Sequence, residues 1–430
     1  MNDHDSSRIR EILSREGYEV KSEMDDTQLV VINTCSVREG PENKLYSLLG
    51  RLSLKKKTNP DLVIGVAGCV AQQEGERILK REKAVDFVFG TDSIFELPSI
   101  LQKVDRGERV VSTSWLARDK KIQNFIPQDE LESGTVDGCK AYLAITKGCD
   151  NYCSFCIVPQ TRGRLVSREV GNILLEAKDL IRKGAKELYL IGQNVNSYQA
   201  NDIGFSELLS AVANLSGLRR LRFMSPHPND WTDPLTDLMA ENSVICNYIH
   251  LPFQAGADRI LTVMRRGHTS DEYLRKTDYL RKKIPDLSIS TDVIVGFPGE
   301  TEAEFQKTLE ILRSVEFSQV YAFKYSPRPD TKASLLEDDV SKIEKEERLK
   351  RLWEVQDSVQ SMILDRMLNT NQNVLIDSAH PRQRGSMNGR TGNNIPVVMP
   401  ASDLEIGDFA DVQIVGRKQH SLIGKIKALS

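Results

Sequence analysis

Hydrophobic and polar positions divide the chain into three zones, and the first of them ends near residue 118. Short apolar runs alternate there with amphipathic stretches of helical spacing. The apolar runs, which predict buried strands, span residues 29–32, 62–66, 87–89 and 110–111. The amphipathic stretches predict helices over 41–54 and 71–83. Because strands that alternate with helices form parallel sheets, residues 1–118 predict a doubly wound α/β domain.

The chain then becomes charged and polar and loses its hydrophobic period, which predicts a linker over 119–134. The second zone, 135–366, resumes the alternation more regularly. Its strand-like runs span 142–146, 187–191, 220–224, 247–251, 287–295 and 319–324. Ser167 and Ser270 precede two of the helical stretches and are expected to cap them. About six strand–helix units fit this spacing and predict a partial (β/α)6 barrel.

Barrels of this kind carry their chemistry on the loops that follow the strands. Each predicted strand of the second zone is followed by a loop of unusual composition, at 147–149, 192–194, 225–228, 252–254, 296–300 and 325–329. The candidate polar residues fall in these loops.

The last zone, 367–430, follows a long charged helix expected from about residue 342. Short strands are expected at 373–376, 395–399, 409–415 and 421–426, with glycines between them. This pattern predicts a small all-β barrel, a fold that often binds nucleic acid. Since the net charge is −3, any RNA contact needs a local basic surface. Its candidates are Arg382, Arg384, Arg390, Arg417 and Lys418. An ordinary solvated surface is the alternative.

Composition indicates where the protein is located and what its cysteines are used for. The first residues are polar and no apolar run is long enough to span a bilayer, so we expect a cytoplasmic protein without a membrane contact. Seven cysteines form an odd and thinly spread set, which disfavours a disulfide framework. The one cluster among them therefore points to metal or redox chemistry.

That cluster is Cys149, Cys153 and Cys156, spaced C-x3-C-x2-C in one loop. Three thiolates suit a 4Fe–4S cube, because they hold three irons and leave the fourth without a protein ligand. A zinc site is the alternative, but structural zinc needs four closed ligands. Cys139 is the nearest candidate for the fourth, and it lies across a predicted strand.

The cysteine spacing, with Phe155 just before the last cysteine, resembles the signature of the radical S-adenosylmethionine (SAM) enzymes. Further motifs resemble the methylthiotransferases of that superfamily, and among them the type that modifies isopentenyladenosine in tRNA (MiaB type). These motifs span residues 33–39, 68–71, 159–163, 192–196, 296–300 and 389–391.

The resemblance implies an N-terminal methylthiotransferase domain, a radical SAM core and a C-terminal TRAM barrel that binds RNA. It implies methylthiolation at C2 of N(6)-isopentenyladenosine, next to the anticodon of tRNA. One SAM methylates a sulfur at an auxiliary cluster, and another supplies the 5′-deoxyadenosyl radical that removes the C2 hydrogen. The implied cofactors are two 4Fe–4S clusters and SAM. The implied partners are the tRNA anticodon loop and an electron donor such as flavodoxin or ferredoxin, and a monomer is expected.

In the resemblance Cys35 and Cys69 are ligands of the auxiliary cluster, and both lie just past predicted strands. Family members usually begin with a strand that ends in Gly-Cys-Gln and carries a third ligand, whereas this chain opens at Met1. We therefore expect a truncated start, because losing an internal strand would leave unpaired backbone inside the sheet. Cys139 is the alternative third ligand, and Cys246 is expected in the core.

The candidates for SAM contact are Phe155, Gln193, Asn194, Gln254 and Asp292. Each polar side chain among them could instead cap a strand or pair with a neighbour. Arg162, Arg164 and Arg168 could meet phosphate, the SAM carboxylate or a salt-bridge partner. Two other functions remain open: a non-catalytic iron–sulfur RNA-binding protein, and a methylthiotransferase acting on another tRNA adenosine or on a ribosomal protein.

Overall fold

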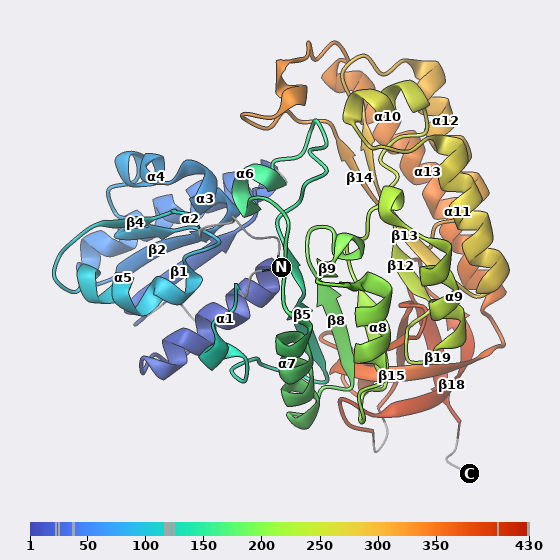
Figure 1. Ribbon diagram of the computed structural model, residues 1–430, viewed down its shortest axis with the longest axis horizontal. Coiled ribbons are helices and arrows are strands. Elements are labelled where there is room, and N and C mark those ends of the chain that lie inside the picture. The colour runs from blue at the N-terminus through green and yellow to red at the C-terminus, as the bar shows by residue number, and fades with distance from the viewer. Residues whose placement is uncertain are drawn as a thin grey trace.

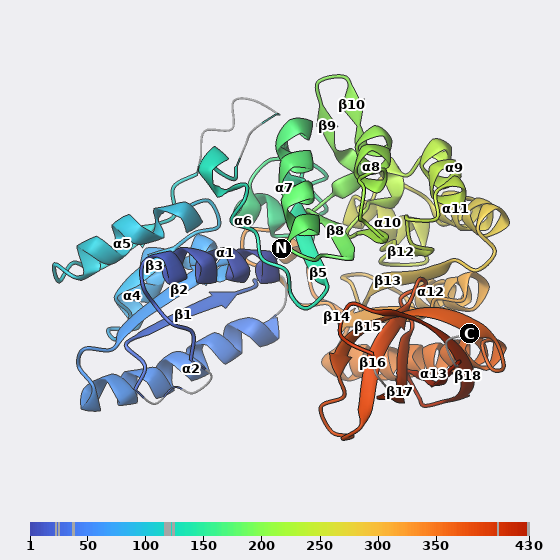
Figure 2. The same cartoon turned by 90° about the horizontal axis from the view of Figure 1, so that it is seen from below.

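The computed structural model describes residues 1–21, 24, 26–36, 39–115, 122, 125–401 and 404–427. Three parts follow one another along the chain (Figure 1): an N-terminal α/β domain, a central strand–helix domain and a C-terminal barrel. In both views the barrel packs on the central domain and lies apart from the N-terminal domain (Figure 2). In the part of the chain that the structure describes, no helix is long and apolar enough to cross a membrane.

The N-terminal domain is a four-stranded parallel sheet with helices on both faces, as its alternating pattern predicts. The strands lie in the order β1 (Leu29–Thr34), β2 (Val63–Gly68), β3 (Phe87–Phe89) and β4 (Val110–Ser112). One face is covered by α2 (Glu39–Thr58), α3 (Cys69–Glu74) and α4 (Glu76–Arg81). The other face is covered by α1 (Asn2–Arg15) and α5 (Leu97–Val104). The helix expected over 71–83 is divided at Gly75, which adopts a positive φ of 49°.

Loss of an internal first strand would leave a gap in this sheet, but the described strands show no such gap. β1 pairs directly with β2 over all six residues, from Leu29 opposite Val63 to Thr34 opposite Gly68. The backbone of these two strands is therefore paired without an intervening strand, so the expectation of unpaired groups there is wrong.

The central domain contains two three-stranded parallel sheets. The first has the order β5 (Lys140–Ala144), β8 (Glu187–Ile191) and β11 (Arg220–Phe223), and the second has β12 (Tyr248–His250), β13 (Ser288–Val295) and β14 (Gln319–Lys324). A parallel bridge between Leu221 and Ile245 joins them into a curved six-strand array. This is the expected partial (β/α)6 barrel.

Helices cover the outer side of this array (Figure 1). They are α7 (Val170–Arg182), α8 (Phe205–Ala213), α9 (Asp233–Glu241), α11 (Ser270–Lys283), α12 (Glu302–Val315) and α13 (Lys342–Arg366). Shorter elements in its loops are α6 (Val158–Arg162), α10 (Asp258–Met264), β6 (Thr146–Lys147), β7 (Val166–Ser167), β9 (Gln199–Ala200) and β10 (Ile203–Gly204). 3-10 turns lie at 195–197, 228–230 and 332–335 in this domain, and at 94–96 and 128–130 before it.

Both predicted helix caps are wrong by a few residues. Ser167 lies in β7, where its Oγ accepts a hydrogen bond from Gln199 N, and Glu169 is the N-cap of α7. Thr269 caps α11, with Glu272 completing a capping box.

The C-terminal barrel is closed in the order β15 (Asn371–Ala379), β16 (Ser386–Thr391), β17 (Pro396–Pro400), β19 (Leu422–Ile426) and β18 (Phe409–Arg417). Two arginines of β11 attach it to the central domain. Arg220 donates to Arg390 O at 2.8 Å, and Arg222 donates to Gly392 O at 2.9 Å. The barrel therefore contacts the core through its own backbone.

The described part of the expected linker is packed against the protein, although it lacks a hydrophobic period. Phe125, Ile126 and Leu131 are buried. Arg8 of α1 donates to Glu130 O at 3.0 Å, and Arg15 forms an ion pair with the Glu130 carboxylate at 2.7 Å. This segment thus helps to hold the N-terminal domain against the core.

Candidate functional site

The cysteine loop begins at the end of β6 and is held by backbone hydrogen bonds. Gly148 has a φ of 79°, and a Cβ there would lie 2.1 Å from Arg164 O, so no other residue fits. Cys149 N donates to Gly163 O at 3.1 Å, and Cys156 N donates to Cys153 O at 3.0 Å. The loop is therefore folded back on itself.

The three cysteines of this loop are partly buried. Burial raises the pKa of Cys149 to about 11 and the pKa of Cys156 to about 12, and the charge of Cys153 adds to both increases. The positive charge of Arg266 acts in the opposite direction and lowers both pKa values. Arg266 Nη1 donates a hydrogen bond to Cys153 Sγ at 3.3 Å. The raised pKa values keep Cys149 and Cys156 as neutral thiols without a metal, whereas a coordinating metal would deprotonate them outright.

The donor set fits an iron–sulfur cube better than a single ion. Among the described residues, no three His, Cys, Asp or Glu side chains converge on a position that could hold one metal ion. A cube binds each thiolate to a different iron and therefore does not need such convergence, whereas zinc does.

A cavity of about 1040 Å³ adjoins the cysteine loop. Its lining includes Phe155 and Cys156 from that loop, together with Gln254 and Asp292. Gln254 has a φ of 72°, and its N donates to Asp292 O at 3.0 Å, so the two residues are held side by side. The Asp292 carboxylate lies 3.3 Å from His250 Nε2. Three of the five residues predicted to contact SAM thus share one cavity with a cysteine of the loop.

Gln193 and Asn194 hold loops in place and are not part of the lining. Gln193 Oε1 accepts from Gly148 N at 2.6 Å and so supports the start of the cysteine loop. Asn194 is buried and donates to Ser197 Oγ and to the Asp230 carboxylate. The structure therefore gives both amides internal partners.

The predicted arginines differ in their surroundings. Arg168 forms a fully buried ion pair with Glu176 at 2.7 Å, while Arg164 is exposed and lies 3.6 Å from Asp150. Arg162 pairs with Asp5 at 2.6 Å. Arg162 and Arg168 thus have buried carboxylate partners, and neither is left for phosphate.

Several residues of the site are not among the five candidates for SAM contact. Lys324, Tyr325, Arg328 and Lys345 also line the cavity. Glu300, in the loop after β13, accepts from Gly296 N at 2.7 Å and from Arg348 Nη1 at 2.9 Å, which fastens that loop to α13. Glu300, Tyr325 and Arg328 lie in strand-end loops that the sequence already singles out, whereas the contact of Glu300 with Arg348 joins residues 48 positions apart and has no local pattern.

Cys35 and Cys69 lie at neighbouring strand ends of the N-terminal sheet, because Thr34 and Gly68 are paired. Arg162, at the end of the helix after the cysteine loop, donates from Nε to Cys69 Sγ at 3.3 Å. Hence a residue that follows the core cysteines contacts a cysteine of the N-terminal domain.

A second connection lies at the other end of the cysteine loop. Lys147 is buried and forms an ion pair with Asp92 at 2.5 Å, and its Nζ donates to Thr91 O. Thr91 Oγ1 in turn donates to Thr161 O at 2.8 Å. The two domains therefore meet at both ends of the core cysteine loop.

The remaining cysteines lie elsewhere. Cys139 is buried just before β5, where its thiol donates to Ile376 O of the barrel. That is the end of β5 opposite the cysteine loop, so Cys139 is not placed to be a third ligand beside Cys35 and Cys69. Cys246 is buried in the core, as expected.

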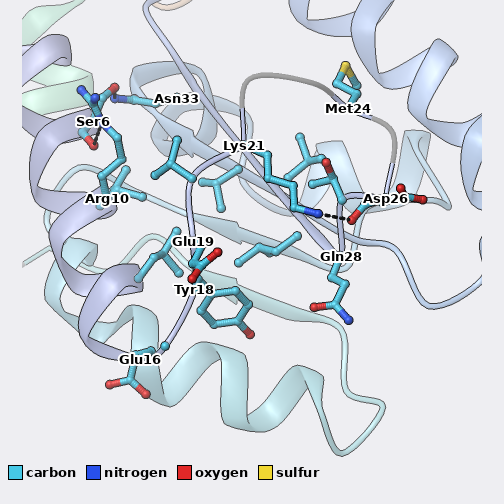
Figure 3. A pocket seen from close by; sticks show the side chains of 18 residues that line it. Ser6, Arg10, Glu16, Tyr18, Glu19, Lys21, Met24, Asp26, Gln28 and Asn33 are labelled. Atoms are coloured by element: carbon cyan, nitrogen blue, oxygen red, sulfur yellow. Dashed lines mark hydrogen bonds between the residues drawn. The ribbon is translucent and has the colours of Figure 1, made fainter.

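A further cavity, of about 960 Å³, lies along α1 and β1 (Figure 3). Arg10 of α1, Glu16 directly after α1 and Asn33 of β1 line it, together with the segment from Tyr18 to Lys21. No cysteine is part of its described lining. It is therefore separate from the cysteine-loop cavity.

Comparison with known proteins agrees with this architecture. The radical SAM superfamily model matches residues 143–312, the TRAM domain model matches 365–427, and the uncharacterized protein family UPF0004 matches 1–90. The radical SAM methyltransferase TsrM from Kitasatospora setae has a similar fold, with a TM-score of 0.56 at 14% identity over 77% of this chain and 70% of that chain. Fold and family models together define a radical SAM protein, whose superfamily uses a 4Fe–4S cluster and SAM.

Full-length relatives identify the family. The tRNA-2-methylthio-N(6)-dimethylallyladenosine synthase of Bdellovibrio bacteriovorus is 42% identical, over 96% of this chain and 90% of the relative. Proteins of the same description from Pelobacter propionicus and from Hydrogenobaculum are 41% and 40% identical, and each comparison covers 99% of this chain and at least 96% of the relative. The chain belongs to the tRNA-2-methylthio-N(6)-dimethylallyladenosine synthase family.

Proposed function

We propose that this protein methylthiolates C2 of N(6)-isopentenyladenosine in tRNA, next to the anticodon. The observation that carries the proposal is the shared cavity, in which the last cysteine of a three-thiol loop meets Phe155, Gln254 and Asp292. The names of the full-length relatives supply the substrate. A non-catalytic iron–sulfur RNA-binding protein would have no need of such a cavity beside its cluster.

In this proposal Cys149, Cys153 and Cys156 hold the catalytic 4Fe–4S cluster. When bound, that cluster supplies the electron that cleaves SAM. Phe155 gives an apolar surface for the adenine of SAM, and Gln254 supplies amide groups for hydrogen bonding. Asp292, held beside His250, offers a carboxylate to the amino group of SAM. Gln193 and Asn194 act indirectly, because they hold the cysteine loop and the next strand-end loop.

We also propose that Cys35 and Cys69 belong to an auxiliary cluster that faces the catalytic one. The contacts of Lys147 with Asp92 and of Arg162 with Cys69 support this, because they hold the two cysteine sites on adjoining surfaces. The proposed partners are the tRNA anticodon loop and a one-electron donor such as flavodoxin or ferredoxin. The enzyme is proposed to act as a monomer in the cytoplasm, where its substrate is found.

The barrel is proposed to add RNA contacts through Arg382, Arg384 and Lys418, which are exposed. The other two candidates have carboxylate partners: Arg417 pairs with Asp365 at 2.5 Å, and Arg390 lies 3.5 Å from Asp377. The expected basic face is therefore smaller than the sequence suggests.

The test is anaerobic reconstitution with iron and sulfide, followed by reaction with SAM, a reductant and isopentenylated tRNA. Nucleoside mass spectrometry should show the 2-methylthio product with the reconstituted, unsubstituted protein, and none with reconstituted Cys153→Ala. Cys246→Ala is the matched control, because its thiol is buried in the core away from the loop. Product formation by the Cys153 variant would contradict the assignment.

A further inference from the structure

Arg266 is the one arginine in direct contact with a cysteine of the loop among the described residues. It follows α10 and is nearly fully buried, with 5% of its surface exposed. Nη1 donates to Cys153 Sγ at 3.3 Å, and Nη2 donates to Pro252 O at 2.7 Å. The planar guanidinium thus spans the middle cysteine and the loop after β12, which a lysine could not do with two donors in a fixed fork.

The segment around Arg266 holds the cysteine loop at two consecutive residues. Met264 O accepts from Ser154 N at 2.9 Å, directly after the contact between Arg266 and Cys153. Arg266 Nε is buried and has no hydrogen-bond partner among the described residues. A cube bound at Cys153 would bring inorganic sulfides, which accept hydrogen bonds, next to this guanidinium.

The surroundings leave the charge of Arg266 uncompensated. Among the described residues, no carboxylate forms an ion pair or a hydrogen bond with it. His268, whose Nδ1 lies 3.1 Å from Arg266 O, and His227 are both buried. Burial, and after it the charge of Arg266, lowers the pKa of His227 to about 2 and the pKa of His268 to about 4, so both imidazoles are neutral at pH 7.

We propose that Arg266 is a positioning residue that holds Cys153 and makes the bound cluster easier to reduce. A buried positive charge and a hydrogen bond to a ligand sulfur both stabilise the reduced cluster, which carries one more negative charge. Arg266 is thereby assigned to the electron-transfer step that precedes SAM cleavage. The inference rests on the proposed function only in needing a cluster at the three cysteines.

The experiment is a redox titration of the reconstituted, SAM-free protein, followed by electron paramagnetic resonance, in a background with Cys35 and Cys69 replaced by Ala so that only the cluster at the three core cysteines is titrated. Arg266→Gln should lower the ratio of reduced to oxidised cluster at a fixed potential at least tenfold, which is about 59 mV for a one-electron couple. Arg266→Lys keeps the charge and should recover part of the shift. Arg265→Gln is the matched control, because the side chain of this neighbouring arginine is exposed and its replacement should leave the midpoint unchanged.

Arg266→Met, which is also neutral, is titrated alongside so that the result does not depend on one substitution. Thermal unfolding of each apo-protein confirms that the fold is retained. A midpoint equal to the unsubstituted protein in both neutral variants, with the cluster bound, would overturn the inference. The absence of any reducible cluster in the unsubstituted protein would instead contradict the proposed function, so the two failures are distinguishable.

Discussion

The buried imidazoles of His227 and His268 predict that the central domain loses stability in mild acid. Their ring centroids are 6.1 Å apart, and each Nδ1 contacts a backbone group: Asn229 N for His227 and Arg266 O for His268. Burial lowers the pKa of His227 to about 2 and that of His268 to about 4, while the unfolded chain titrates near pH 6.5. A histidine whose folded pKa is lowered contributes stability above pH 6.5 that is lost as the pH falls toward the folded pKa.

The magnitude follows from these values. At pH 5 the unfolded state binds a proton at each imidazole and the folded state does not, so each lowers the free energy of unfolding by roughly 2 kcal/mol relative to pH 7.5. The pair together should account for about 4 kcal/mol. Such a decrease is a large part of the stability of an ordinary domain.

The assay is urea unfolding followed by the fluorescence of Trp231, which is buried in the central domain. Replacing the exposed Trp115 and Trp353 by Phe leaves Trp231 as the single tryptophan, since the chain has three, and selective tryptophan excitation then reports on it alone. Asn can replace either imidazole, because its side-chain amide reaches the backbone partner of Nδ1. A double Asn variant with the same decrease between pH 7.5 and pH 5 as the unsubstituted protein would refute the reasoning.

Three further predictions concern the cluster, the domain contact and the barrel. Cys153→Ala should abolish reductive SAM cleavage and lower the iron content, because two thiolates do not define one open iron; 5′-deoxyadenosine is the readout. Lys147→Met removes the buried ion pair with Asp92 and should cost about 3–5 kcal/mol of unfolding free energy, and adding Asp92→Asn should restore part of it. Replacing both Arg382 and Arg384 by Gln should weaken tRNA binding and reduce the slope of log K against log salt by roughly 0.7 for each phosphate that is no longer neutralised, and an unchanged slope would exclude them from the interface.

Elements with a continuous apolar run could be predicted from the sequence almost to the residue. The strands at 187–191 and 319–324 have the expected bounds, because each is packed on the core that helices cover. β16 lacks such a run. At its centre is Gly389, where a Cβ would lie 2.6 Å from Leu375 O, so close approach of the backbone excludes the side chain that would have revealed the strand.

The hydrophobic pattern does not predict the helix α1, for a different reason. Its buried residues include His4, Asp5 and Arg8 as well as Ile9 and Ile12, so its inner face is partly ionic. Arg8 is buried through an ion pair with Glu176, a partner 168 residues away. Because these side chains are charged, a pattern of hydrophobic positions does not indicate that they are buried.

The residues of the site also fall into two groups: those that a local sequence pattern indicates, and those whose role depends on contacts with distant residues. The cysteine spacing and the polar strand-end loops could be recognised locally, and three of the five candidates for SAM contact line the cavity. Arg266 could not be recognised, since its contact with Cys153 spans 113 residues. Nor could the bracing roles of Gln193 and Asn194, which depend on contacts with Gly148 and Asp230 from other loops.

In the proposed reaction this chain removes the C2 hydrogen of a tRNA adenosine by SAM-derived radical chemistry and replaces it with a methylthio group. The direct measurement uses isopentenylated tRNA carrying deuterium at C2 of the target adenine, with mass spectrometry of the 5′-deoxyadenosine formed. The proposed reaction should give deuterium in 5′-deoxyadenosine together with the 2-methylthio nucleoside in tRNA. Formation of 5′-deoxyadenosine without deuterium, in a reaction where the tRNA is bound and remains unmodified, would contradict it.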